Sequence, residues 1–162
     1  MSRSFYFYVL VSLSSACSYS SLGLAEGSRE VTKTSDSLAS GVLNFKVEKY
    51  QLSNGLIVLL HEDHSVPLLS LHLWFRVGSI SEENGFTGLA HLFEHLMFAG
   101  TPRFPKGEFD RILQANGATN NAVTSFNYTN YYESFPSNKL SLILDIESDR
   151  LRNLNITTET FK

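Results

Sequence analysis

TGLAHLFEHLMFAG, residues 87–100, is the stretch around which this chain is organised. At about 100° per residue, a helix here brings His91 and His95 within roughly 40° of each other and places Glu94 on the same half of its surface. The opposite half is apolar and consists of Leu89, Leu92, Phe93, Leu96 and Met97. The sequence therefore predicts a short helix with one face for packing and one face for chemistry.

The polar face has the composition of a zinc site. Two histidines at i and i+4 project side by side, so both rings can reach one Zn²⁺ at about 2.0–2.1 Å. Glu94 points about 100° away from His95, which suits it less as a ligand of the same ion than as the base that takes a proton from a polarised water. The alternative is that His91 and His95 are ordinary polar residues on a solvated face. Their shared face with Glu94 favours the metal interpretation.

Residues 91–95 form the His-x-x-Glu-His motif of the inverted zinc proteases. The resemblance extends from Leu52 to Arg150, which is similar to the amino-terminal domain of the M16 peptidases, the family of pitrilysin, insulin-degrading enzyme and mitochondrial processing peptidase. The similar segments, in the family's order, are LSNGLIVLLHED, RVGSISEENGFTGLAHLFEHLMFAGT, NGATNNAVTSFNYTNYY and IESDR. The resemblance implies a zinc-dependent metalloendopeptidase that cleaves extended peptides.

The same resemblance implies that the domain continues. In the family the third zinc ligand is a Glu roughly 75 residues beyond the second His, which falls about ten residues past Lys162. Glu147 lies within an apolar stripe, where a carboxylate must be paired, hydrogen-bonded or functional, and we expect a packing or supporting role beside Arg150 rather than the role of third ligand. We therefore expect the peptidase domain to be incomplete at its C-terminal end. The resemblance also implies a second M16-like domain or subunit that helps to enclose a peptide or small-protein substrate.

A polar strand follows the second predicted helix. Residues 118–126 contain few large apolar side chains and form a predicted β-hairpin with residues 130–135. The resemblance implies that this strand takes the substrate backbone as an added strand, with Asn121 and Ala122 near the metal. A plain polar edge strand explains the same composition equally well.

The other elements follow from periodicity and turn residues. Asn54-Gly55 separates two apolar runs and predicts a hairpin. Strands are predicted at 46–52, 56–62, 68–77, 118–126 and 130–135. Helices are predicted at 87–100, with Thr87 as the N-cap, at 106–116, and from Ser137 onward. The apolar face of the last helix consists of Leu140, Ile143, Leu144, Leu151 and Leu154. The expected fold is α+β, with an antiparallel or mixed sheet and helices packed on one side, over residues 45–162.

The first 25 residues read as a signal peptide. Arg3 supplies a positive start, residues 5–13 an apolar run, and residues 23–25 a cleavage site of small residues. An earlier cut after Ala16 would leave Cys17 at the new terminus, loosely resembling a lipoprotein anchor. A disordered or buried apolar start is the alternative. Export predicts a secreted or periplasmic protein, and residues 26–44 read as a flexible lead-in.

Composition restricts the possible functions. With 162 residues and 43% hydrophobic content the chain can bury one core. A net charge of -3 argues against a nucleic-acid partner, and residues 5–13 are too short for a transmembrane span. The first interpretation is therefore a zinc endopeptidase. The second is a non-catalytic M16-like subunit for peptide binding or assembly, or an inactive fragment.

Overall fold

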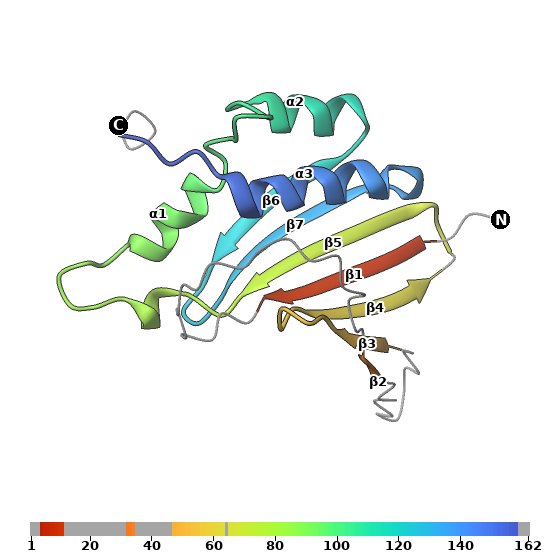
Figure 1. Cartoon of the computed structure of the whole chain (residues 1–162), viewed down its shortest axis with the longest axis horizontal. Coiled ribbons are helices and arrows are strands. Elements are labelled where there is room, and N and C mark those ends of the chain that lie inside the picture. The colour runs from red at the N-terminus through yellow and green to blue at the C-terminus, as the bar shows by residue number, and fades with distance from the viewer. Residues whose placement is uncertain (1–3, 12–31, 35–46, 64, 159–162) are drawn as a thin grey trace, which may run out of the picture.

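The computed structural model describes residues 4–11, 32–34, 47–63 and 65–158. Its strands form one sheet in the order β2-β3-β4-β1-β5-β7-β6 (Figure 1). The strands are β1 Ser4–Val11, β2 Thr32–Thr34, β3 Val47–Gln51, β4 Ile57–Asp63, β5 Leu68–Phe75, β6 Thr119–Thr124 and β7 Thr129–Pro136. The helices are η1 Ser79–Ser81, α1 Leu89–Leu96, α2 Glu108–Ala115, η2 Ser137–Lys139 and α3 Leu140–Asn153. Cys17 and most of the predicted lead-in lie outside the described residues.

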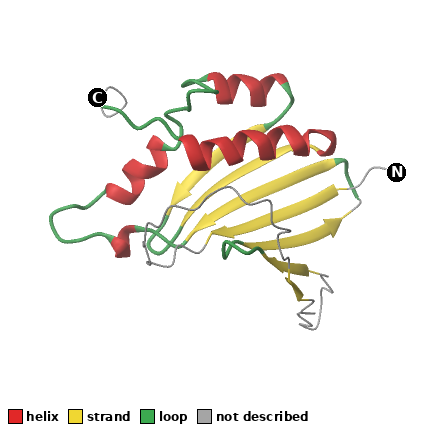
Figure 2. Cartoon of the chain, in the orientation of Figure 1, coloured by secondary structure: helices red, strands yellow, loops and turns green. Residues whose placement is uncertain are grey.

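The helices α2 and α3 run along one face of the sheet (Figure 2). Leu69, Leu71 and Leu73 alternate along β5 and are buried, as expected where every second side chain faces the core. They join a cluster completed chiefly by Phe109 and Leu113 of α2, Phe135 of β7, and Ile143 and Ile146 of α3. Because β1 is parallel to β5 and the other pairs are antiparallel, the sheet is mixed. The predicted α+β fold is confirmed. Among the described helices, none has both the length and the apolarity to cross a bilayer.

The predicted hairpins are present. β3 and β4 pair antiparallel around the Asn54-Gly55 turn, where Gly55 has φ of 86°, a left-handed conformation that glycine adopts without steric cost. β6 and β7 pair antiparallel in the same way. The turn residues in the sequence therefore predicted the positions of the β3–β4 and β6–β7 turns correctly.

β1 falls within the predicted signal peptide. It pairs antiparallel with β4 and parallel with β5, and it lies between them (Figure 1). β4 and β5 are consecutive in sequence but are joined in the sheet only through β1. Cleavage after Ala25 stays a prediction, and it would remove this strand from the sheet.

The buried face of α3 differs from the predicted one. Leu144 and Leu151 are exposed, whereas Ile146 and Arg150 are buried beside Ile143 and Glu147. Two charged side chains can occupy this face because they neutralise each other: Arg150 Nη2 donates to Glu147 Oε2 at 2.6 Å. The guanidinium of Arg150 also lies over three aromatic rings, those of Phe98, Phe109 and Tyr131. The predicted place of Glu147 beside Arg150 is confirmed, and the contact is an ion pair.

A second carboxyl group, that of Glu133 on β7, faces this ion pair. Glu133 is buried, and neither of its oxygens has a hydrogen-bond donor among the described residues. Burial, with the neighbouring charge of Glu147, raises the pKa of Glu133 to about 10. Glu133 is therefore neutral at pH 7, which removes its repulsion with the neighbouring charge of Glu147.

Candidate metal and peptide site

The helix α1 stands apart from α2 and α3 (Figure 1) and contacts η1 and β6. The face predicted to pack is largely open: Leu89 and Leu92 are exposed, and Phe93 is 52% exposed. Ala90, Glu94 and Leu96 are buried. The predicted apolar face therefore packs only in part, through Leu96 and Met97, because α1 also turns Ala90 and Glu94 toward the sheet.

The start of α1 also differs from the prediction. Thr87 is not the N-cap; that position is Gly88, with φ of 93° and no capping side chain. The first backbone N–H groups of the helix are instead bound by the carboxylate of Glu82. The helix is shorter than predicted and ends at Leu96.

His91 and His95 meet as the helical spacing predicts. Their Nε2 atoms are 3.1 Å apart, and both side chains are exposed. Two nitrogens bound to one tetrahedral Zn²⁺ at about 2.0–2.1 Å would be separated by about 3.3 Å. The donor pair therefore fits one zinc ion without a change in the helix.

Glu94 lies beside these histidines but is held differently. Its side chain is buried, and Oε2 accepts a hydrogen bond from Thr124 Oγ1 of β6. His91 and Glu94 line one hollow of ≈ 560 Å³, together with Ala122 and Thr124. An imidazole, a carboxylate and the edge of a strand therefore face the same space.

β6 is the last strand of the sheet. Ala122 faces the hollow, whereas Asn121 is exposed and does not line it. Asn121 Oδ1 accepts the backbone N–H of Ala122 at 2.8 Å. The substrate roles of Asn121 and Ala122 stay predictions.

A complete set of protein ligands is not present in the described part of the chain. There, no group of three His, Cys, Asp or Glu side chains is arranged to hold a metal ion. Glu147 is buried beside Arg150. The third ligand that the resemblance implies, a Glu beyond Lys162, stays a prediction.

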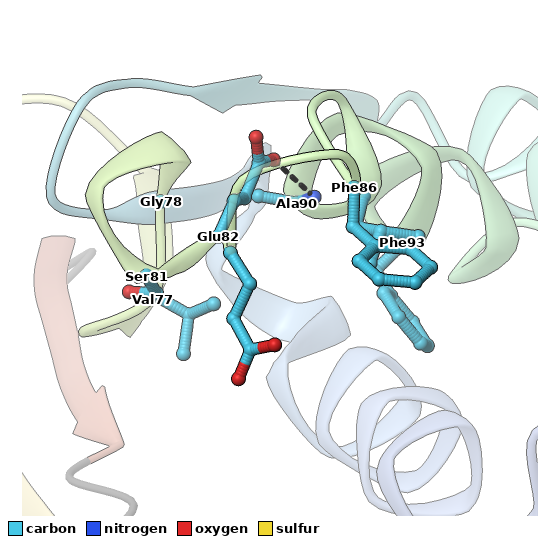
Figure 3. Close-up of a pocket in the computed structure, with 9 residues that line it drawn as sticks. Val77, Gly78, Ser81, Glu82, Phe86, Ala90 and Phe93 are labelled. Carbon is cyan, nitrogen blue, oxygen red and sulfur yellow. Dashed lines mark hydrogen bonds between the residues drawn. The ribbon is translucent and has the colours of Figure 1, made fainter.

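Two residues of the site were not predicted. Thr124 could have been found from strand alternation, because it shares a face with Ala122. Glu82 carries no such signal, since it lies in a loop and reaches its partners across several residues. A second hollow, of ≈ 330 Å³, is apolar and is lined by Val77, Phe86 and Phe93 among others (Figure 3). The sequence did not predict this hollow, because it forms where the apolar face of α1 stays uncovered.

Comparison with known sequences agrees with this geometry. The profile of the family described as Insulinase (Peptidase family M16) matches residues 57–162. The zinc protease PqqE of Helicobacter pylori is 32% identical over 117 residues, which cover 72% of this chain and 26% of that protein. Human insulin-degrading enzyme is 36% identical over 96 residues, which cover 59% of this chain and 9% of that protein.

Solved structures show the same relationship. A protease from Helicobacter pylori superposes with a TM-score of 0.65 at 33% identity, covering 72% of this chain and 28% of that one. Pitrilysin superposes with a TM-score of 0.68 at 25% identity, and the match covers 80% of this chain and 14% of pitrilysin. The chain thus spans between 9% and 28% of the length of these proteins. The chain belongs to the insulinase family, peptidase family M16.

Proposed function

We propose that this chain contributes the first part of a zinc endopeptidase site, in which His91 and His95 bind Zn²⁺ and Glu94 is the catalytic base. The observation that supports this most is the placement of His91 and Glu94 in one hollow beside β6, with His95 Nε2 3.1 Å from His91 Nε2. Membership of a family whose relatives are named zinc proteases supports a peptidase-like function.

The chemistry of the described side chains agrees with this role. A bound zinc ion would polarise the attacking water and the scissile carbonyl. Thr124 holds Oε2 of Glu94, which leaves Oε1 to accept a proton from that water. Glu94 then returns the proton to the leaving amine, so one carboxylate serves as base and as acid.

The open edge of β6 supports an extended peptide as the substrate. A peptide laid along an edge strand gains backbone hydrogen bonds whatever its sequence. The N–H of Ala122, which Asn121 Oδ1 accepts in this structure, would be one donor for such a peptide once a peptide carbonyl replaces that side-chain acceptor. The half-buried Ala122 also leaves room for a peptide to approach His91 and Glu94.

The rest of the active protein is part of the proposal. A Glu about ten residues beyond Lys162 would be the third ligand, and a second M16-like domain or subunit would close over the substrate. The longer relatives leave room for both, because this chain covers 26% of PqqE and 9% of human insulin-degrading enzyme. A secreted or periplasmic location is also a proposal, carried by the predicted signal peptide.

The test is cleavage of an unstructured fluorogenic peptide by the full-length protein. We expect cleavage to stop when zinc is chelated, to return when zinc is added, and to be absent in His91→Ala. His61→Ala, on β4, is the histidine control and should cleave normally. Peptide binding without cleavage in the zinc-loaded protein would contradict the proposal and favour a non-catalytic subunit.

A further inference from the structure

Glu82 bridges two backbone groups at the start of α1. Its Oε2 accepts the N–H of Gly88 at 2.8 Å, and its Oε1 accepts the N–H of Ala90 at 2.8 Å. Figure 3 shows the contact with Ala90, with Glu82 reaching across from the loop that precedes the helix. One side chain therefore satisfies two donors near the helix start.

These donors need an outside partner because the first turn of a helix has none of its own. Gly88, at the N-cap, has no side chain to offer. The negative charge of Glu82 also suits the positive end of the helix dipole. The hydrogen bonds from Ala90 and Gly88 lower the pKa of Glu82, so its carboxylate is charged at pH 7.

The loop that carries Glu82 is fixed at its other end to the β6–β7 turn. Ser79 N–H donates to Ser125 O at 3.2 Å, and Ile80 N–H donates to Phe126 O at 2.8 Å. The backbones approach so closely that a Cβ on Gly78 would lie 2.4 Å from Ser125 O. A short and tightly held path therefore runs from the end of β6, through η1, to Glu82 and α1.

We propose that Glu82 is a positioning residue that stabilises the first turn of α1 and sets the place of α1 relative to β6, so that the helix presenting His91 and His95 to one zinc ion is formed and Glu94 faces the strand edge. The inference rests on the proposed function. Both oxygens of Glu82 are engaged by backbone N–H groups, so we do not assign it as a metal ligand. It acts through the helix that carries the ligands.

The neighbouring Glu83 provides a matched control. It has the same charge, lies one position away, is exposed, and makes no side-chain hydrogen bond to a described residue. Glu83→Gln therefore removes the same charge without affecting α1. Glu82→Gln keeps one acceptor oxygen, and Glu82→Ala keeps none.

The experiment measures zinc affinity, by competition with a chromophoric chelator, and peptide cleavage on the full-length protein and these three variants. Removing a helix cap typically changes the helical equilibrium by about 2- to 30-fold. We expect Glu82→Ala to weaken zinc binding within that range, Glu82→Gln to weaken it less, and Glu83→Gln to match wild type. With Co²⁺ as the probe, we expect both Glu82 variants to change the shape of the visible absorption bands, because the ligand geometry changes.

The outcomes separate this inference from the proposed function. If wild type binds no zinc and cleaves no peptide, the proposed function fails and this inference fails with it. If wild type is active and Glu82→Ala has the zinc affinity and cobalt spectrum of Glu83→Gln, only the positioning role is wrong. A lower denaturation midpoint in Glu82→Ala with unchanged zinc affinity and unchanged band shape would likewise overturn it, since that is a purely structural effect.

Discussion

Thr124 of β6 donates a hydrogen bond to Oε2 of Glu94 in α1, across 30 residues of sequence. This bond joins the helix that carries the candidate zinc ligands to the strand that offers an open edge. It also fixes which oxygen of Glu94 remains for a reacting water. The orientation of the proposed base thus depends on a residue outside the His-x-x-Glu-His motif.

Replacing this hydroxyl should affect catalysis more than metal binding. Thr124→Val keeps the shape of the side chain but removes the donor to Glu94. A hydrogen bond to a charged group is worth about 1.5–3 kcal/mol, so we expect peptide cleavage to fall roughly tenfold or more while zinc content is retained. Thr119→Val, at an exposed position of the same strand, is the control. Equal cleavage by the two variants would mean that Thr124 does not orient the base.

The ion pair of Arg150 with Glu147 allows a direct comparison of a buried and an exposed pair. Both it and the Arg103–Asp145 pair have N–O distances of 2.6 Å, but the Arg103 pair is exposed. Arg150→Met leaves Glu147 as an uncompensated buried charge, which typically costs about 3–5 kcal/mol.

We expect urea unfolding to show such a loss for Arg150→Met and a much smaller loss for Arg103→Met, whose partner stays solvated. Similar losses of unfolding free energy for both variants would show that the buried Arg150–Glu147 pair contributes no more to stability than the exposed Arg103–Asp145 pair.

Glu133 should make stability fall as pH rises. Its pKa is raised to about 10 in the folded protein, compared with about 4.3 in an unfolded chain. Between these values the folded state holds one proton more than the unfolded state, so the stabilisation is complete below the lower value and is lost as pH rises through the higher one.

Glu133→Gln keeps a neutral side chain and removes this dependence. We expect the stability of Glu133→Gln relative to wild type to increase from pH 5 to pH 9, by up to about 1.4 kcal/mol per pH unit. Glu108→Gln, whose partner Arg111 lowers the pKa of Glu108, should show no such increase. A flat difference for Glu133→Gln would mean that Glu133 is ionised in the folded protein.

Removal of residues 1–25 tests the role of β1. Without β1, the facing edges of β4 and β5 lose their shared neighbour, and unpaired strand edges promote association. We expect residues 26–162 to unfold at a lower urea concentration than the whole chain and to form oligomers in sedimentation experiments. A chain without residues 1–3, which keeps β1, is the control. A monomer of residues 26–162 with an unchanged unfolding midpoint would show that β1 is dispensable.

The features predicted correctly are those encoded over short distances. Asn54-Gly55 fixes the β3–β4 turn because the required backbone conformation is local. His91 and His95 meet because the period of a helix brings i and i+4 together. The pairing of Glu147 with Arg150 follows from the same local spacing, since a charge in an apolar stripe needs a partner.

The features that were missed depend on contacts between distant segments. Phe93 was expected to pack, but its exposure depends on the orientation of α1 relative to the sheet. The neutral state of Glu133 depends on its burial and then on Glu147, which faces it from α3. The cap at α1 could not be predicted from Thr87, because Glu82 reaches the helix from an irregular loop. In each case the sequence of one segment does not show which distant residue will contact it.

The measurement that tests the central claim most directly is zinc content and peptide cleavage on the same preparations of Glu94→Gln and His95→Ala. Glu94→Gln removes the base and keeps both imidazoles, so we expect full zinc content with cleavage reduced about 10²- to 10⁴-fold. His95→Ala removes a ligand, so we expect it to lose zinc and cleavage together. Loss of zinc from Glu94→Gln as complete as from His95→Ala would contradict the account, because Glu94 would then be a ligand rather than the base.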